Sequence, residues 1–229
     1  MDAEKVFSLS VSRSWKTAYP GAVAGIMVLK NAANPKKSDA LESKKRELEN
    51  TLRSQFSNKS ELAALPIIQA YATYYKSFRK NYHVLFQLES IALKGKSIPS
   101  VVSLVEAMFL AELKNRLLTA GHDLNALELP VTIDISKGHE RYTMLNGKEQ
   151  SLKPGDMMMT DNQGIISSVI YGPDRRTRIT QETKNPLFVV YAPPGVGEGQ
   201  VIRHLQDIKE YIELFSPEVY VDSFETFVA

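Results

Sequence analysis

The first 60 residues combine two apolar segments with one amphipathic segment. Residues 22–29 (AVAGIMVL) form an unbroken apolar run after a Pro-Gly turn, which predicts a strand buried on both faces. Residues 7–15 alternate apolar side chains with serines, which predicts a strand with one buried face. From Ser38, which can cap it, the spacing becomes helical. The apolar stripe of this helix is Leu41, Leu48, Leu52 and Phe56.

The same helix carries a basic cluster whose members alternate with glutamates. This alternation is typical of a solvated helix face rather than of a phosphate site. The cluster consists of Lys36, Lys37, Lys44, Lys45 and Arg46.

Residues 61–118 predict three more helices. Pro66 begins the first, Asn81 lies near the start of the second, Gly95 ends it, and Pro99 precedes the third over residues 101–118. Aromatic side chains recur along the first two at spacings that favour core positions over a stacking platform for bases. They are Tyr71, Tyr74, Tyr75, Phe78, Tyr82 and Phe86. The third helix is expected to bury Val102, Val105, Phe109, Leu113 and Leu117 and to end at residues 120–123 (AGHD).

Short strands separated by turns fill most of the second half. Asn146-Gly147 is the strongest two-residue hairpin signal in the chain. An amphipathic helix is expected over residues 201–215, and the tail at 216–229 is apolar enough to dock on the rest. The predicted strands are residues 129–135, 141–145, 157–160, 165–171 and 187–191. Helices first and hairpins afterwards predict an α+β fold, with helices packed on a mostly antiparallel sheet, as one domain over residues 1–229.

Between the last two of these strands lies a basic, threonine-rich loop, RRTRITQET. Thr180 can cap a short helix there, and Asn185-Pro186 ends it. A polar loop held between two strands is a plausible functional element, because rigid elements position side chains well. The alternative is a solvated loop whose arginines only keep the surface soluble.

Composition excludes several classes of function. Charge is nearly balanced, with 28 basic and 26 acidic residues, so a nucleic-acid partner needs a local patch. The absence of cysteine excludes disulfides, zinc–thiolate sites and thiol nucleophiles. The N-terminal residues lack the apolar core of a secretory signal, and no apolar run is long enough to span a membrane. We therefore expect a soluble, cytoplasmic protein.

Few side chains have the spacing of known catalytic or metal sites. The four histidines lie in different predicted elements, so we expect no metal and no cofactor. His122 lies at a predicted helix-to-strand junction beside Asp123, where it can be either an oriented acid–base group or part of a cap. Glu106 and Glu112 lie on the third helix, where either one could face a cleft or the solvent.

Five motifs in a fixed order resemble the B3/B4 domain, which occurs in the β-subunit of phenylalanyl-tRNA synthetase and as free-standing proteins. They are YPGAVAGIMVLKN, LKGKSIPSVVSLVEAMFLAEL, AGHDLNAL, NGKEQSLKPGDMMMTDNQG and RRTRITQETKNPLFVVY. The resemblance covers about residues 15–215, and the free-standing form is the more similar one. It implies an α+β fold with a β-sandwich-like core and a cleft between helices and sheet. In the synthetase this cleft hydrolyses tyrosine wrongly attached to tRNA, so the resemblance implies a tRNA partner and a trans-editing role.

The resemblance also assigns candidate residues. Ala120 stands where the synthetase has a histidine, with His122 two residues later, and Asp174 stands where the synthetase has a glutamate. With Glu112, these two residues are the catalytic candidates. Met108, Phe109, Thr183 and Asn185 are the candidates for contact with substrate, and Arg175, Arg176, Arg178 and Lys184 for contact with RNA. The histidine is thus displaced and the acidic side chain is one methylene shorter than in the synthetase. These two differences leave two alternatives, a substrate other than tyrosine or an inactive cleft.

Three hypotheses about function follow. The chain deacylates mischarged aminoacyl-tRNA in trans, or it binds tRNA or an amino-acid-like ligand without catalysis, or it is an unrelated small-molecule enzyme that reuses the cleft. Salt dependence separates RNA binding from small-ligand binding, because each phosphate contact steepens the dependence on salt.

Overall fold

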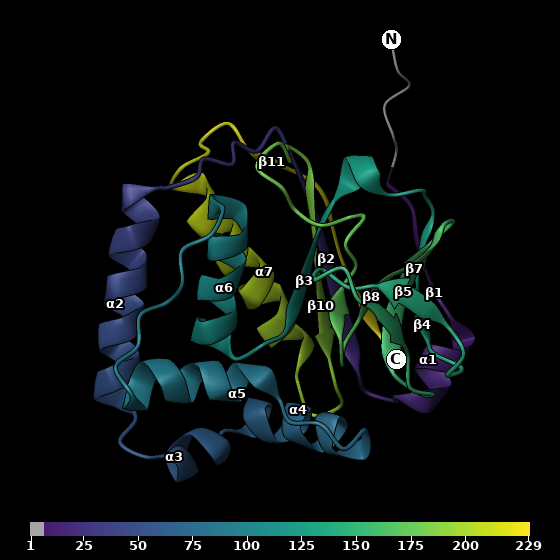
Figure 1. Ribbon diagram of the computed structural model, residues 1–229, viewed down its shortest axis with the longest axis horizontal. Helices are drawn as coiled ribbons and strands as arrows, with labels where there is room; N and C mark the ends of the chain where they lie inside the picture. Colours follow the sequence, from purple (N-terminus) through teal and green to yellow (C-terminus); the bar gives the residue numbers. More distant parts are fainter. Residues whose placement is uncertain (1–6) are drawn as a thin grey trace.

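The computed structural model describes residues 7–229 and confirms an α+β fold in which most strand pairs are antiparallel. Apart from the helix at Arg13–Ala18, the helices lie on one side of two β-sheets (Figure 1). The strands are β1 Leu9–Val11, β2 Val23–Lys30, β3 Thr119–Asp123, β4 Val131–Ile135, β5 Arg141–Thr143, β6 Glu149–Ser151, β7 Met157–Asp161, β8 Gly164–Ser168, β9 Gly172–Pro173, β10 Pro186–Ala192 and β11 Tyr220–Val228. The α-helices are α1 Arg13–Ala18, α2 Asp39–Gln55, α3 Lys59–Ala63, α4 Pro66–Ser77, α5 His83–Leu88, α6 Ser103–Asn115 and α7 Glu198–Glu213.

The two larger sheets share one core. One has the strand order β11-β2-β10-β3 and the other β1-β4-β7-β8-β9, in which only the pair β1–β4 is parallel. The strand β10 is buried along its whole length between β2 and β3, and Tyr191 on it lies within hydrogen-bond distance of Ser167 on β8. The apolar character predicted for this strand and for β2 is explained by this central position.

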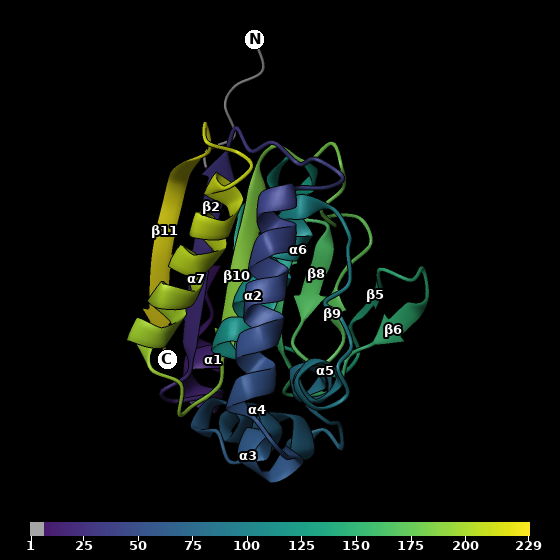
Figure 2. The ribbon, with the colours of Figure 1, turned by 90° about the vertical axis from the view of Figure 1, so that its left-hand side faces the viewer.

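Helices α6 and α7 cover the outer face of the sheet that contains β2. Figure 2 shows α7 lying along β2 and β11, with α2 beside it in front of α6 and the β5–β6 hairpin projecting at the opposite edge of the view. The contact between α7 and β2 is close, because a Cβ atom on Gly25 would lie 2.3 Å from Val201 Cγ1. A glycine at this position lets the helix approach the sheet.

Several local predictions are confirmed. Ser38 caps α2 by accepting a hydrogen bond from the backbone N–H of Leu41, and Pro66 begins α4. Gly147 has a positive φ of 81° at the tip of the β5–β6 hairpin. The aromatic residues of α4 and α5 lie in the core, except for Phe86, which is 49% exposed.

Other local predictions are wrong because tertiary contacts decide them. Residues 7–15 do not form one strand: Ser12 caps α1, and Trp15 is buried on that helix. Residues 119–123 form β3 rather than a helix end, because they pair with β10. Residues 179–183 form a turn rather than a short helix. The prediction that the tail docks on the rest of the chain is confirmed, because the tail forms β11 and extends the sheet beside β2.

The basic cluster of α2 is not uniformly solvated. Lys45 is buried, and its Nζ lies 2.5 Å from Glu42 Oε1 and 3.2 Å from Glu106 Oε2. Glu106 is therefore an internal ion-pair partner rather than a cleft or surface residue. A buried lysine needs such a partner, because an unpaired buried charge is costly.

The inner face of α6 also differs from the prediction. The helix is buried almost all round, and Leu104, Ala107, Leu110 and Ala111 face the core. Val102, Val105 and Phe109 are half-buried instead. They line a cavity beside α6.

The expectation that the N-terminal residues form no secretory signal concerns positions 1–6 in part, and these positions lie outside the described residues. The extent of the domain over residues 1–229 stays a prediction. Among residues 7–229, no helix combines the length and the apolar character needed to cross a bilayer.

Candidate functional site

A cavity of about 660 Å³ opens beside α6, between this helix, α5, β3 and the turn that joins β8 to β9. Residues far apart in the sequence meet there, from Lys36 at the N-terminal side of α2 to Tyr191 on β10. Its volume lies within the range of small-molecule sites, roughly 300–1,000 Å³.

The cavity walls are mainly apolar. Met108 and Phe109, both predicted as substrate contacts, lie on the wall formed by α6. Gly121 lies opposite, and a Cβ atom there would lie 2.8 Å from Ile179 Cδ1 and 3.3 Å from Met108 Sδ. The remaining apolar lining includes Val101, Val102, Val105, Leu118, Leu145 and Ile179. Such walls favour an apolar group of a ligand.

Glu112 brings a carboxyl group to this apolar cavity. It follows Met108 by one turn of α6, so both side chains lie on one face of the helix. Its Oε1 accepts a hydrogen bond of 2.7 Å from the backbone N–H of Thr119. Burial raises the pKa of Glu112 to about 8, and the hydrogen bond from Thr119 opposes that rise. A carboxyl group with a pKa near neutral can accept a proton during a reaction.

Other polar groups of the cavity were not predicted from sequence. His83 lies within 3.4 Å of the Tyr75 hydroxyl, and burial lowers the pKa of this histidine. Ser168 donates a hydrogen bond to the buried carboxyl group of Asp156, which also accepts a 2.6 Å bond from the Tyr74 hydroxyl. Burial raises the pKa of Asp156 to about 6. Tyr74, Tyr75 and His83 lie in one segment of the chain, and Asp156 and Ser168 lie in two others. No sequence motif links the three segments.

His122 and Asp174 are brought together, but neither lines the cavity. The Thr177 hydroxyl donates to Asp174 and lies 2.7 Å from His122 Nδ1, so His122 donates from Nδ1 to Thr177. Its Nε2 is buried and has no partner among the described residues. Burial, and secondarily Arg176, lowers the pKa of His122 to about 3, while burial raises the pKa of Asp174.

This arrangement fixes the basic loop to β3. The backbone N–H of Asp123 donates to Thr177 O over 2.7 Å, and His122 forms an antiparallel bridge with Arg178. His122 is therefore part of a strand and not of a cap, whereas Asp123 caps a short 3₁₀ turn by accepting from Asn125 N.

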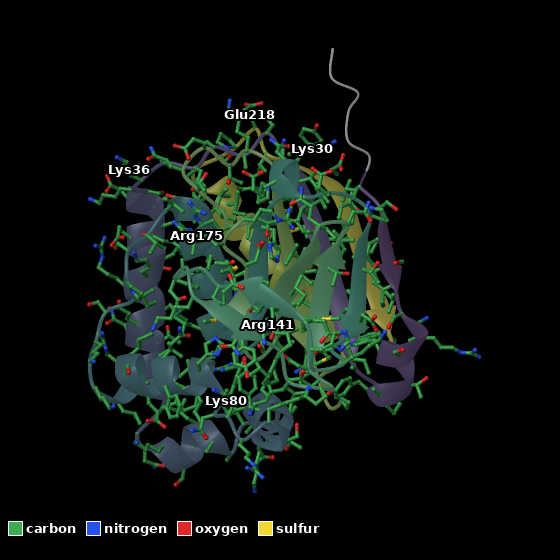
Figure 3. All side chains as sticks on the ribbon, turned by 45° about the vertical axis from the view of Figure 1, so that its right-hand side comes forward. Lys30, Lys36, Lys80, Arg141, Arg175 and Glu218 are labelled. Carbon is green, nitrogen blue, oxygen red and sulfur yellow. The ribbon has the colours of Figure 1, made fainter. Side chains whose placement is uncertain are left out.

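The predicted RNA contacts divide into bound and exposed groups. Arg176 makes two 2.8 Å hydrogen bonds to the carboxylate of Asp161 and another to Ala126 O, so its guanidinium is engaged within the fold. Arg178 lines the cavity and donates to Arg175 O. Arg175 and Lys184 are exposed. In the view of Figure 3, Lys36, a cavity residue, and Arg175 both lie in the upper left of the molecule.

Thr183 and Asn185 are engaged in local structure. The Thr183 hydroxyl donates to Asp123 Oδ2 and accepts from Thr180 N, and Asn185 donates to Asn125 Oδ1. Neither residue lines the cavity. Among the described residues, no group of three or more His, Asp or Glu side chains could hold a metal ion.

Comparisons with known proteins agree with this architecture. A family model described as the B3/4 domain matches residues 68–204, which is more than half of the chain. The chain belongs to the B3/4 domain family. The matched segment includes α6, β3 and the basic loop, and so most of the cavity.

Two individual proteins are similar over different extents. The phenylalanine–tRNA ligase beta subunit of Mycoplasma pneumoniae is 32% identical over 69 residues, which is 30% of this chain but only 9% of that protein. An N-terminal fragment of the phenylalanyl-tRNA synthetase beta-subunit from Pyrococcus horikoshii has a TM-score of 0.52 at 11% identity. This similarity covers 98% of this chain and 55% of the fragment. At this identity the structural match shows the fold alone.

Proposed function

We propose that this chain hydrolyses the ester bond of a mischarged aminoacyl-tRNA in trans. The observation that carries the proposal is a buried carboxyl group, that of Glu112, at an apolar cavity of a B3/4 domain. The related synthetase subunits supply the connection to tRNA. The cavity supplies a site of suitable size for the side chain of an amino acid.

Binding follows from the walls of the cavity. An apolar or aromatic side chain of the amino acid would pack against Met108 and Phe109 on the wall formed by α6. Arg178 and Lys36, which also line the cavity, would attract backbone phosphates of the tRNA acceptor end. Arg175 and Lys184 would extend this contact along the acceptor end, whereas Arg176 is retained by Asp161.

Glu112 would act as the general base. In its carboxylate form it takes a proton from a water molecule, and the water oxygen attacks the ester carbonyl carbon. The carbon–oxygen bond to the ribose then breaks, and the ribose oxygen takes the proton that Glu112 had accepted, which restores the carboxylate. The products are a free amino acid and a tRNA with its terminal hydroxyl restored.

His122 and Asp174 have a different role in this proposal. Through Thr177 they fix the loop that carries Arg178 and Ile179 against β3. They are therefore positioning residues rather than groups that touch the substrate.

A binding module without catalysis is the second candidate. It is favoured by the placement of His122 and Asp174 away from the cavity. Of the three catalytic candidates, Glu112 alone lines the cavity. Such a module would retain tRNA or an amino-acid-like ligand in the same place without cleaving it.

Deacylation of a panel of radiolabelled mischarged tRNAs tests the proposal. Wild-type protein should hydrolyse at least one species, and Val105→Trp, which fills the cavity, should abolish this while the protein stays folded. Val221→Trp on β11, whose side chain is exposed and outside the cavity, is the control. Salt-sensitive tRNA binding without hydrolysis would favour the binding module. Hydrolysis that survives Val105→Trp would place the reaction elsewhere.

A further inference from the structure

A second, smaller cavity of about 310 Å³ adjoins the main one. Phe109 and Gln87 line both cavities, so the two cavities meet at these side chains. The second cavity lies between α5, the π-helical segment Glu89–Leu93, the loop at 96–99 and α6.

Its lining combines aromatic rings with free polar groups. Phe86 and Phe109 contribute the rings, and Phe86 is 49% exposed although the neighbouring aromatic side chains of α4 and α5 are buried. Ser90, Ser97 and Lys96 contribute two hydroxyls and an ammonium. Within residues 7–229, none of these three side chains makes a hydrogen bond or an ion pair. They are available to a ligand.

The loop that carries Lys96 and Ser97 is fixed in advance. Arg53 on α2 donates to the carbonyl oxygens of Ile91, Gly95 and Lys96, and Glu49 accepts from the backbone N–H of Ile98 over 2.7 Å. The Lys96 N–H also donates to Ser90 O. Turns of π-helix interrupt α-helices frequently at functional sites. A preformed cavity reduces the ordering cost of binding.

We propose that this second cavity binds a nucleoside monophosphate, the terminal nucleotide of the ester whose aminoacyl group lies in the main cavity. This inference rests on the proposed function. A base stacks on Phe86, since an aromatic ring accepts the face of any base, and the Ser90 and Ser97 hydroxyls meet its polar edge or the ribose. Lys96 lies at the same cavity and pairs with the phosphate.

Calorimetric titration with adenosine 5′-monophosphate and with adenosine tests the inference. Wild-type protein should bind both, and Phe86→Ala should weaken both by about fivefold or more through lost stacking. Lys96→Ala should weaken the monophosphate and leave adenosine unchanged, because adenosine has no phosphate. Phe224→Ala, another exposed phenylalanine, and Lys94→Ala, a neighbouring lysine outside both cavities, should bind as wild type does.

The outcomes separate this inference from the proposed function. Absence of nucleotide binding, or binding unaffected by Phe86→Ala, would overturn the second site even where mischarged tRNA is still hydrolysed. Nucleotide binding that depends on Phe86 and Lys96, in a protein that hydrolyses no mischarged tRNA, would support the site while the proposed reaction fails. Unfolding curves for each variant separate lost binding from lost structure.

Discussion

Glu112 on α6 accepts a 2.7 Å hydrogen bond from the backbone N–H of Thr119, the first residue of β3. This bond joins the end of the cavity helix to the edge strand of the sheet beside the main cavity. The carboxyl group that makes it is buried, and its pKa is raised to about 8 by that burial. The same residue therefore connects the stability of the fold to the proposed chemistry.

The raised pKa of Glu112 makes folding stability depend on pH. Between its ordinary value of 4.5 and about 8, the unfolded chain loses this proton while the folded chain keeps it, so stability falls as pH rises through that window. Glu112→Gln keeps an acceptor for Thr119 N and removes the titration. We expect its stability relative to wild type, measured by urea unfolding, to increase by about 4 kcal/mol from pH 4.5 to pH 8.5. A difference that stays constant with pH would contradict the assignment.

The Thr177 hydroxyl is expected to be important for stability. Thr177→Val removes the donor to Asp174 and the acceptor for His122, both of which are buried. Unsatisfied buried groups destabilise a fold, here by about 2 kcal/mol. Thermal unfolding checks this, with the exposed Thr51→Val on α2 as control. Equal melting temperatures for the two variants would show that the hydroxyl contributes nothing.

Arg176 and Arg178 should behave differently although they are two residues apart. Arg178→Ala should weaken tRNA binding and lower the slope of log affinity against log salt by about 1, as the loss of one phosphate contact does. Arg176→Ala should leave that slope unchanged and lower the melting temperature, because it leaves the buried carboxylate of Asp161 without its cation. Filter binding at several salt concentrations distinguishes the two. The opposite pattern would mean that Arg176 leaves Asp161 to bind RNA.

Gly25 sets the distance between β2 and α7. Gly25→Ala places a methyl group 2.3 Å from Val201 Cγ1 and 3.1 Å from Leu205 Cδ1, and such overpacking costs about 1–3 kcal/mol. Gly199→Ala, in the first turn of α7 where the nearest atom is 3.7 Å away, is the matched control and should be neutral or slightly stabilising. Chemical denaturation measures both. A neutral Gly25→Ala would show that α7 can shift without loss of packing.

Sequence alone predicted the elements whose signals are local. The Ser38 cap, the start of α4 at Pro66 and the Asn146-Gly147 hairpin each depend on a few adjacent residues. The order of motifs identified the family because it uses most of the chain. By contrast, residues 119–123 (TAGHD) have no strand pattern, and they form β3 only because β10 offers a partner. The burial of Lys45 likewise depends on Glu106, 61 positions away.

The lining of the main cavity could be predicted in part for the same reason, while the roles of its residues stay predictions. Met108, Phe109 and Glu112 lie on one face of α6 and belong to one sequence motif. Once that motif indicates that the helix borders a cleft, all three residues are expected there. Lys36, His83 and Ser168 come from segments that meet only in the folded chain, and no local signal marks them. The engagement of Arg176 with Asp161 is also a long-range contact, so the three arginines of the loop look alike in sequence.

The most direct test of the central claim is the pH dependence of single-turnover deacylation, with saturating protein and one mischarged tRNA, for wild type and Glu112→Gln. If Glu112 is the general base, the wild-type rate should rise more than about tenfold between pH 6.5 and 8 and level off above about pH 9, as the carboxylate forms. The Glu112→Gln rate should be at least about a hundredfold lower. A wild-type rate that does not change with pH, or a Glu112→Gln variant as active as wild type, would contradict the claim.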